Sequence, residues 1–182
     1  MIESLAGWLR PVLNIPFISR TRRNHGLEHA TIHLLSARVK NLRMAGRSDA
    51  GGFILIGDAP TALIETSARE ALRRMQNGEQ HLAVHPNCGT NLVTTGVLTS
   101  AAALLGFSGV SRRDAWERLP FMSMVMIVLL IVSQPLGGSL QKHLTTDGDP
   151  GDLTILSVTR STMPGLMGGT VTVHRVRTAD QP

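Results

Sequence analysis

The chain has 182 residues, enough for one domain or for one small domain together with membrane segments. Its 18 Lys and Arg residues outweigh 13 Asp and Glu residues, and the resulting charge of +5 suits either a membrane surface or a nucleic acid. Aromatic residues make up only 3% and the basic residues are scattered or lie beside apolar stretches, so we expect no nucleic-acid partner. A single cysteine, Cys88, excludes an intrachain disulfide.

The N-terminal segment, residues 1–20, does not have the pattern of a secretory signal. Glu3 comes early, Arg10 and Pro11 interrupt the apolar run, and no small-residue cleavage site follows. Apolar residues can share one side of a short helix here, namely Leu5, Trp8, Leu9, Val12 and Leu13. This pattern predicts a segment lying in the membrane interface, and the alternative is a peripheral helix packed on the protein itself.

Residues 21–91 are expected to form an α+β domain. A helix is predicted over residues 22–40, followed by turn chemistry in "MAGRSDAGG" and a short strand in "GFILIGD". Asp58 and Pro60 mark the start of a second helix, for which Gly78 makes a C-terminal stop. The apolar positions of that helix recur at helical spacing: Ile64, Ala68, Ala71, Leu72 and Met75.

Two uncharged apolar stretches follow, over residues 92–107 and 119–140. A bilayer core needs roughly 20 helical residues, so the second stretch is long enough and the first is borderline. The short linker between them is charged and carries Trp116, which suits the headgroup layer. We therefore predict a transmembrane helical hairpin over residues 92–140, with a pair of buried core helices in a soluble protein as the alternative.

The C-terminal residues 141–182 alternate like two strands, "DLTILSVTR" and "TVTVHRVRT", joined by the Gly- and Pro-rich "STMPGLMGG". They are expected to complete the soluble domain by joining the strand at residues 53–57 in a small sheet. The predicted fold class is thus α+β with a transmembrane hairpin. Basic residues lean towards cytoplasmic termini, although the arginines of the short linker argue for the opposite orientation; the prediction is an integral membrane protein with its soluble part in the cytoplasm, partnered by the lipid bilayer. A protein partner or oligomer is not specified.

The stretch "HGLEHATIH" carries the first group of residues that could perform chemistry. At 100° per residue, His25, Glu28, His29 and His33 fall on one helical face about 140° wide, with an apolar face opposite. His25 and His29 are one turn apart, so their imidazoles can converge on one ion. The spacing is H-x-x-E-H, in which two histidines bind Zn²⁺ and the glutamate acts on the bound water as general base. The alternative is a solvated His/Glu helix face.

The second group is "HPNCGTN", residues 85–91, where two residues separate His85 from Cys88 as in metal-binding knuckles. Pro86 and Gly89 suit a tight turn that could direct both side chains to one point. Alone, this pattern also fits a turn that leads into the first membrane helix. Together the two groups predict a site for zinc or another divalent transition metal.

The motif pair resembles H-G-x-E-H … H-P-x-C-G-T of the YqhQ-like bacterial membrane proteins, which are described as metal-dependent enzymes of undefined reaction. It is more similar to a bacterial family of unknown function that carries N-H-x-L-E-H-A-T-I-H and A-V-H-P-N-C-G-T-N, a likeness that covers roughly residues 20–140. By this resemblance the motif positions are His25, Glu28, His29, His85 and Cys88. Gly26, Pro86, Gly89 and Thr90 frame them, and His33 belongs to the closer pattern alone, so it is expected to support the site.

Two functions follow from these patterns. The first is a membrane-bound, zinc-dependent hydrolase, with a peptidase as one candidate, in which Glu28 is catalytic and the ligands come from His25, His29, His85 and Cys88. The second is a non-enzymatic membrane protein whose metal site is closed and structural and whose α+β domain binds a partner. An open coordination position distinguishes an enzyme from a structural site. His81, His143 and His174 are expected to be surface or structural residues.

Overall fold

The computed structural model describes residues 2–165 and 168–181. The chain divides into two compact units, one formed by Met1–His85 with Lys142–Pro182 and the other by Pro86–Gln141. Each unit is described by itself. Most of the residues that the sequence singles out for chemistry belong to the first unit, and Cys88 belongs to the second.

The first unit is an α+β layer structure, as predicted. Its helices and strands in chain order are α1 (Ile2–Leu13), α2 (Pro16–Arg38), β1 (Ala45–Asp49), β2 (Gly52–Ile56), α3 (Thr61–Gln76), the short helix η1 (Gln80–Ala83), most of the short helix η2 (Gln141–Thr145), β3 (Leu153–Pro164) and β4 (Thr170–Asp180). The four strands form one antiparallel sheet in the order β1-β2-β4-β3. The prediction that the C-terminal strands join the strand at residues 53–57 is therefore confirmed, because β4 pairs with β2.

Strand β1 corrects the turn that was predicted for the whole of "MAGRSDAGG". Residues 45–49 pair with β2 from Ala45 opposite Ile56 to Asp49 opposite Gly52, and the tight turn is confined to the residues between them. Ala, Gly, Ser and Asp have low strand propensity, so pairing with the apolar β2 decides the conformation here. The turn itself has the expected chemistry, since Gly51 donates its N–H to the carboxylate of Asp49 at 2.8 Å.

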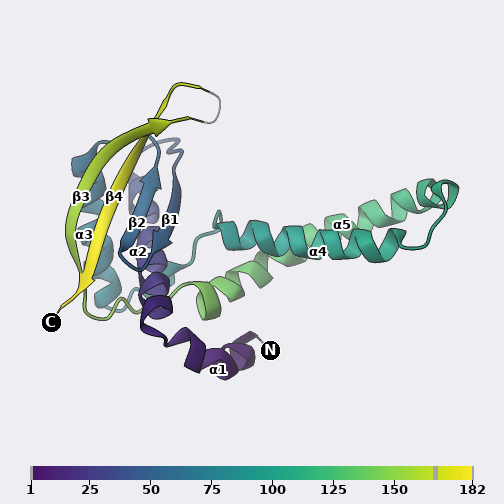
Figure 1. Cartoon of the computed structure of the whole chain (residues 1–182), viewed down its shortest axis with the longest axis horizontal. Coiled ribbons are helices and arrows are strands. Elements are labelled where there is room, and N and C mark those ends of the chain that lie inside the picture. Colours follow the sequence, from purple (N-terminus) through teal and green to yellow (C-terminus); the bar gives the residue numbers. More distant parts are fainter. Residues whose placement is uncertain (1, 166–167, 182) are drawn as a thin grey trace. The chain divides into compact units, whose positions relative to one another are not determined.

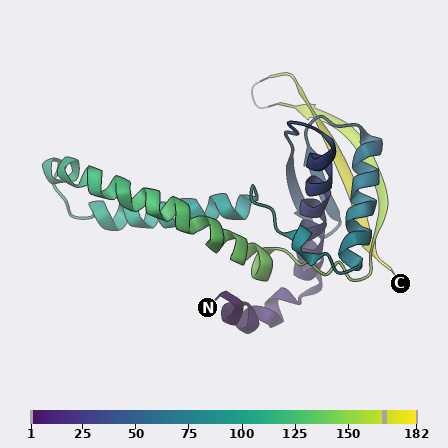
Figure 2. The same ribbon diagram turned by 180° about the vertical axis from the view of Figure 1, so that it is seen from behind.

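Helices α2 and α3 cover the same face of the sheet (Figures 1 and 2). The predicted helical positions of α3 are confirmed, because each of them is buried in the core. Gly78 ends that helix with φ +97° and donates its N–H to the carbonyl of Met75 at 2.9 Å. The core between the layers contains mainly aliphatic side chains, among them Leu27, Leu35, Phe53, Leu55, Ile64, Leu153 and Val176.

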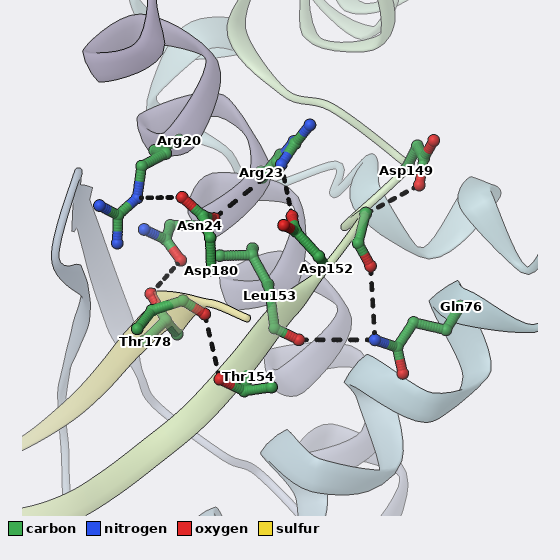
Figure 3. Close-up of polar contacts among 12 residues, drawn as sticks. Arg20, Arg23, Asn24, Gln76, Asp149, Asp152, Leu153, Thr154, Thr178 and Asp180 are labelled. Carbon is green, nitrogen blue, oxygen red and sulfur yellow. Dashed lines mark hydrogen bonds and ion pairs between the residues drawn. The ribbon is translucent and has the colours of Figure 1, made fainter. Parts of the chain in front are cut away.

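A fully buried amide fixes the N-terminal half of α2 to the sheet (Figure 3). Asn24 donates to the carbonyl of Asp49 at 2.9 Å and accepts from the hydroxyl of Thr178 at 2.7 Å. Two ion pairs join the same half of the helix to the sheet ends, Arg20–Asp180 at 3.3 Å and Arg23–Asp152 at 3.2 Å. Because Asn24 precedes His25 directly, these contacts position the start of the histidine motif.

The second unit is a pair of antiparallel helices, α4 (Gly89–Phe107) and α5 (Arg112–Leu140). Both are long and apolar enough to cross a membrane, judged by length and composition. Helix α5 begins earlier than the predicted apolar stretch because the hydroxyl of Ser111 accepts from the N–H of Asp114 at 3.3 Å and caps its first turn. The charged linker residues are thus helical rather than loop.

Small and polar side chains hold these two helices together. Gly137 lies so close to Asn91 that an added Cβ would overlap its side chain, and the hydroxyls of Thr95 and Ser133 hydrogen-bond across the pair at 2.6 Å. Close backbone approach at glycine and hydroxyl bonds between helices are typical of helix pairs in membranes. The large apolar side chains point away from the partner helix and are exposed, including Leu104, Leu105, Phe121, Met124, Ile127 and Ile131.

Candidate metal centre

Four histidines of the first unit gather at the side of α2 that faces η1 and the residue after it. The ring centroids of His25 and His29 are 4.4 Å apart, those of His29 and His85 are 5.8 Å apart, and those of His33 and His85 are 4.6 Å apart. His25, His29 and His33 lie on successive turns of one helix, whereas His85 follows η1. The structure therefore brings His85 to the other predicted ligands and adds His33 to the same cluster.

Backbone carbonyls fix the tautomers of the two motif histidines. Nδ1 of His25 lies 2.9 Å from the carbonyl oxygen of Thr145, and Nδ1 of His29 lies 2.7 Å from that of Ala83. A carbonyl oxygen can only accept, so in the neutral rings Nδ1 carries the proton and Nε2 carries the lone pair. A ligand histidine in a metalloprotein is oriented in this way, with one nitrogen donating to the protein and the other available to bind a metal.

The separation of these two rings suits a shared ion. Ligand nitrogens of His25 and His29 lie within 4.8 Å of each other. This limit is close to the separation of two nitrogens that share one ion, because a zinc–nitrogen bond is about 2.0–2.1 Å long. This histidine group could therefore hold a metal ion, although nothing in its geometry selects zinc over another divalent transition metal.

His33 has the opposite tautomer. Its Nε2 lies 2.9 Å from the carbonyl oxygen of Val84, which makes Nε2 the donor and leaves the lone pair on Nδ1. The histidine rings on three successive turns of α2 thus each donate to a backbone carbonyl. The carbonyls that hold His29 and His33 are those of the adjacent residues Ala83 and Val84. The main-chain segment that precedes His85 therefore orients His29 and His33, whereas Thr145 orients His25.

His85 is neutral across the physiological pH range. Burial lowers the pKa of its imidazole, and the charge of the nearby His33 and His29 rings when they are protonated acts in the same direction, so that together they bring the pKa to about 4. A histidine binds a metal only through a deprotonated nitrogen, so this environment favours the form that a ligand requires.

Glu28 faces strand β1, on the sheet side of α2. Its carboxylate is buried, with 4% of the residue exposed, and it accepts a hydrogen bond from the hydroxyl of Ser48. The carboxylate also packs on Gly46, where an added Cβ would overlap it. Burial raises the pKa of Glu28, while the Ser48 hydrogen bond and the nearby His25 oppose that rise. Glu28 is thus held in one orientation next to the histidine group.

At Gly26 the absence of a side chain lets residues 144–147 lie close to α2, a contact that the sequence did not predict. A Cβ added at residue 26 would overlap the carbonyl oxygen of Asp147 and would lie 3.1 Å from the Cβ of Ala83. The N–H of Asp147 donates to the carbonyl of Arg22 at 3.0 Å. Residues 144–147 therefore lie directly against α2 and supply the Thr145 carbonyl. The only signal in the sequence is a glycine inside a helix.

The predicted thiol ligand lies at the start of the second unit. Cys88 is the N-cap of α4, and its sulfur accepts from the N–H of Thr90 at 3.4 Å. Its role as a metal ligand stays a prediction, as do the roles assigned to the other site residues. Among the remaining histidines, His81 is exposed on η1 and His174 is fully buried in β4, where Nδ1 lies 3.4 Å from the hydroxyl of Thr61.

The chain is similar to proteins whose function is not defined. Residues 20–158 match the family described as "Domain of unknown function (DUF6391)". An uncharacterized protein of Picosynechococcus sp. (strain ATCC 27264 / PCC 7002 / PR-6) is 29% identical over 134 residues, which are 69% of this chain and 65% of that protein. The chain thus spans less than two thirds of the length of this curated relative. No solved structure matches the chain. Since the family match covers both histidine motifs and both apolar helices, the chain belongs to the DUF6391 family.

Proposed function

We propose that this protein is a membrane-anchored, metal-dependent hydrolase in which His25, His29 and one further ligand hold a zinc-like ion. The observation that carries the proposal is the pair of hydrogen bonds from Nδ1 of His25 and His29 to backbone carbonyls, at 2.9 and 2.7 Å. Hydrogen bonds of this kind orient the imidazoles of metal ligands, whereas histidines on a solvated helix face would bond to water instead. The resemblance to YqhQ-like proteins points in the same direction.

The further ligand is His85 or Cys88. His85 is in ring contact with His29, and its environment keeps it neutral. Cys88 follows three residues later, so its Cα lies within about 11 Å of the Cα of His85 even in a fully extended chain. One of these side chains gives three protein ligands, which leaves a coordination position for substrate, whereas both of them close a tetrahedral site.

Glu28 is the residue we assign to proton transfer. It lies one position before His29 on the same helix, and the Ser48 hydrogen bond fixes its carboxylate. When bound, the ion would act as a Lewis acid on a carbonyl or phosphoryl oxygen of the substrate. Glu28 would take a proton from the attacking water and return it to the leaving group, which is the role of the glutamate in an H-x-x-E-H motif.

The membrane part of the proposal concerns α4 and α5. Only 11% of the apolar window in each helix is buried inside the structure, whereas the core helix of a soluble protein is mostly buried. Their exposed Leu, Ile, Val, Met and Phe side chains would be stable in the hydrocarbon core of a bilayer but not in water. Helix α4 is about 28 Å long, which is close to the thickness of that core. Trp116 is exposed near the linker, where an interfacial tryptophan is expected. We place the first unit in the cytoplasm.

Substitution of Glu28 tests the hydrolase directly. The full chain, purified in detergent and loaded with Zn²⁺, would be assayed with fluorescein-labelled casein and with p-nitrophenyl acetate. We expect Glu28→Gln to lower the rate on the cleaved probe by about 100-fold or more without loss of bound metal. Glu65→Gln is the matched control, because that carboxylate is exposed on α3. Wild-type rates in Glu28→Gln, or no cleavage by the wild type above buffer, would show that the hydrolase proposal is wrong.

A structural metal site is the second candidate. The burial of Glu28 against Gly46 and its bond to Ser48 favour it, because they also describe a carboxylate that only connects α2 to β1. In that case His85 and Cys88 would both bind the ion and the α+β domain would serve a protein partner. Bound metal without turnover, together with loss of the folded state on chelation, would distinguish this function from the first.

The membrane assignment has its own test. We expect the full chain to stay in the membrane pellet after alkaline carbonate washing and to require detergent for extraction. A green fluorescent protein fused to the C-terminus should be fluorescent, because the fusion folds only on the cytoplasmic side. Release by carbonate or by salt would contradict the membrane hairpin.

A further inference from the structure

A cavity of about 320 Å³ lies between α1 and the start of the segment that follows α5. It belongs to the first unit, and it is distinct from the histidine group. Its basic lining side chains are Arg10 of α1, Arg22 of α2, and Lys142 with His143. Glu3 is the one acidic residue that lines it. The cavity is therefore polar and positively charged, which suits a ligand with negative charge.

The basic side chains differ in how they are held. The guanidinium of Arg22 donates to the carbonyls of Leu144 at 2.8 Å and Thr146 at 3.0 Å and pairs with the carboxylate of Asp147 at 3.5 Å, so it is held in place and its charge is partly balanced. Within the described part of the chain, neither Arg10 nor Lys142 has a side-chain hydrogen bond or ion pair. Two cationic groups that face a cavity without a protein partner are available to a ligand. A phosphate group offers the acceptor oxygens that Arg and Lys bind.

The opposite side of α1 is apolar and exposed. Leu5, Trp8 and Val12 recur at helical spacing, and Trp8 is 79% exposed. At 100° per residue they lie roughly opposite the residues that line the cavity, such as Arg10. None of the described residues of α1 is buried. A short helix with one exposed apolar face and one basic face is the pattern of a helix that lies in the plane of a membrane interface.

Two features suit a site at the level of lipid phosphates. An interfacial helix lies about 5–10 Å into the boundary between headgroups and acyl chains and is about 10–12 Å thick, so its polar face reaches the headgroups. Lys142 and His143 lie in the short helix η2 (Gln141–Thr145), which continues α5, so they belong to the last turns of a candidate membrane span. Basic residues in this position bind anionic headgroups.

We propose that this cavity binds the phosphate group of an anionic phospholipid through Arg10 and Lys142, with α1 lying in the interface. The inference depends on the membrane part of the proposed function and is independent of the metal. The ligand class is a phospholipid with net negative charge, such as phosphatidylglycerol. Bound lipid would fix α1, which itself packs only lightly on the rest of the first unit, and would thereby connect the start of α2 to the membrane.

Fluorescence of Trp8 tests the proposal on the full chain in mixed micelles. The chain has two tryptophans, so a Trp116→Phe background leaves Trp8 as the only one. Quenching of Trp8 would be titrated with dibrominated phosphatidylglycerol and with dibrominated phosphatidylcholine. We expect quenching at a lower mole fraction of the anionic lipid, and we expect Arg10→Gln/Lys142→Gln to weaken that preference by about fivefold for each basic side chain removed.

The matched control is Arg112→Gln/Arg113→Gln, which removes the same charge at the start of α5 and should keep the preference. Equal quenching by both lipids in the wild type, or an unchanged preference in Arg10→Gln/Lys142→Gln, would overturn the proposal. Loss of the preference in millimolar inorganic phosphate, but not in chloride of equal ionic strength, would also overturn it in favour of a soluble anion. Carbonate extraction of each variant separates these outcomes from a failure of the hairpin to insert.

Discussion

Nδ1 of His29 donates to the carbonyl oxygen of Ala83 at 2.7 Å, across 54 positions of the sequence. This bond joins the second histidine of the H-x-x-E-H motif to the segment that leads into the second motif. It fixes the lone pair of His29 on Nε2, and it brings His85 against the same helix. Two patterns that are separate in the sequence are thus parts of one structural group.

Gly26 is expected to tolerate no side chain. A Cβ in Gly26→Ala would overlap the carbonyl oxygen of Asp147, so the segment that holds His25 would have to move, at a cost of about 1–3 kcal/mol in the free energy of unfolding. Thermal unfolding in detergent, together with metal content, measures the effect. Gly96→Ala is the control, because an added Cβ meets nothing within 4 Å at that helical position. Similar stability of the two variants would contradict the close approach.

Asn24 is expected to be the strongest single polar contact of α2. Asn24→Ala removes two buried hydrogen bonds and leaves the hydroxyl of Thr178 without its partner, which should destabilise the first unit by about 2–3 kcal/mol. The exposed Asn77→Ala should change stability by less than about 0.5 kcal/mol. Chemical denaturation followed by circular dichroism compares them. An equal effect of both substitutions would mean that Asn24 is not an anchor.

The packing of α4 on α5 can be tested with two adjacent glycines. A Cβ at Gly137 would overlap the side chain of Asn91, whereas one at Gly138 meets nothing within 4 Å. We therefore expect Gly137→Val to destabilise the helix pair by about 1–3 kcal/mol and Gly138→Val to have little effect beyond helix propensity. Unfolding in mixed detergent micelles gives the two values. Equal loss in both variants would show that the helices do not meet at this face.

Stability should depend on pH through the pair of Asp49 and Arg175. Arg175 donates to Asp49 at 2.6 and 2.8 Å, which lowers the pKa of that carboxyl below its usual 3.8. The contribution is therefore present above pH 3.8 and is lost as the pH falls through the lower, folded value. The pair is partly exposed, so its contribution is less than about 1 kcal/mol.

Arg175→Gln measures this contribution as a difference in the free energy of unfolding from the wild type between pH 2 and pH 6. The difference should shrink towards zero at the acidic end of that range. Arg177→Gln on the same strand, an exposed position, should show no such change. A difference that is constant with pH would mean that the pair does not stabilise the sheet.

Periodicity predicts most of the fold because burial decides it. The apolar positions of α3 and the alternation in β4 are each sufficient to assign the element, and the structure buries the α3 residues that were expected to be inside. Strand β1 was missed because its residues, Ala45 to Asp49, have turn chemistry and become a strand only by pairing with β2. Pairing between strands is not local, so a single stretch of sequence does not reveal it.

In the candidate site, too, the features that follow from the helix period were predictable, and those that depend on contacts between distant segments were not. The helix period predicts that His25, His29 and His33 share a face, and the structure confirms this. The carbonyls of Ala83 and Thr145 were not predictable, since every residue has a carbonyl and only the chain path selects which one is near. Glu28 was expected on the same face, and in the structure its carboxylate lies near enough to His25 for the two charges to interact while it also accepts a hydrogen bond from Ser48 of β1, which the helix period could not predict. A helical wheel does not include the sheet that packs beside it.

The metal content of the purified full chain tests the central claim most directly. After dialysis against a weak chelator, the wild type and the exposed-histidine control His81→Ala should each retain one equivalent of a divalent transition metal, whereas His29→Ala should retain none while keeping its helical circular dichroism. A wild type that binds no metal after incubation with Zn²⁺, or a His29→Ala variant that binds as much as the wild type, would contradict the account.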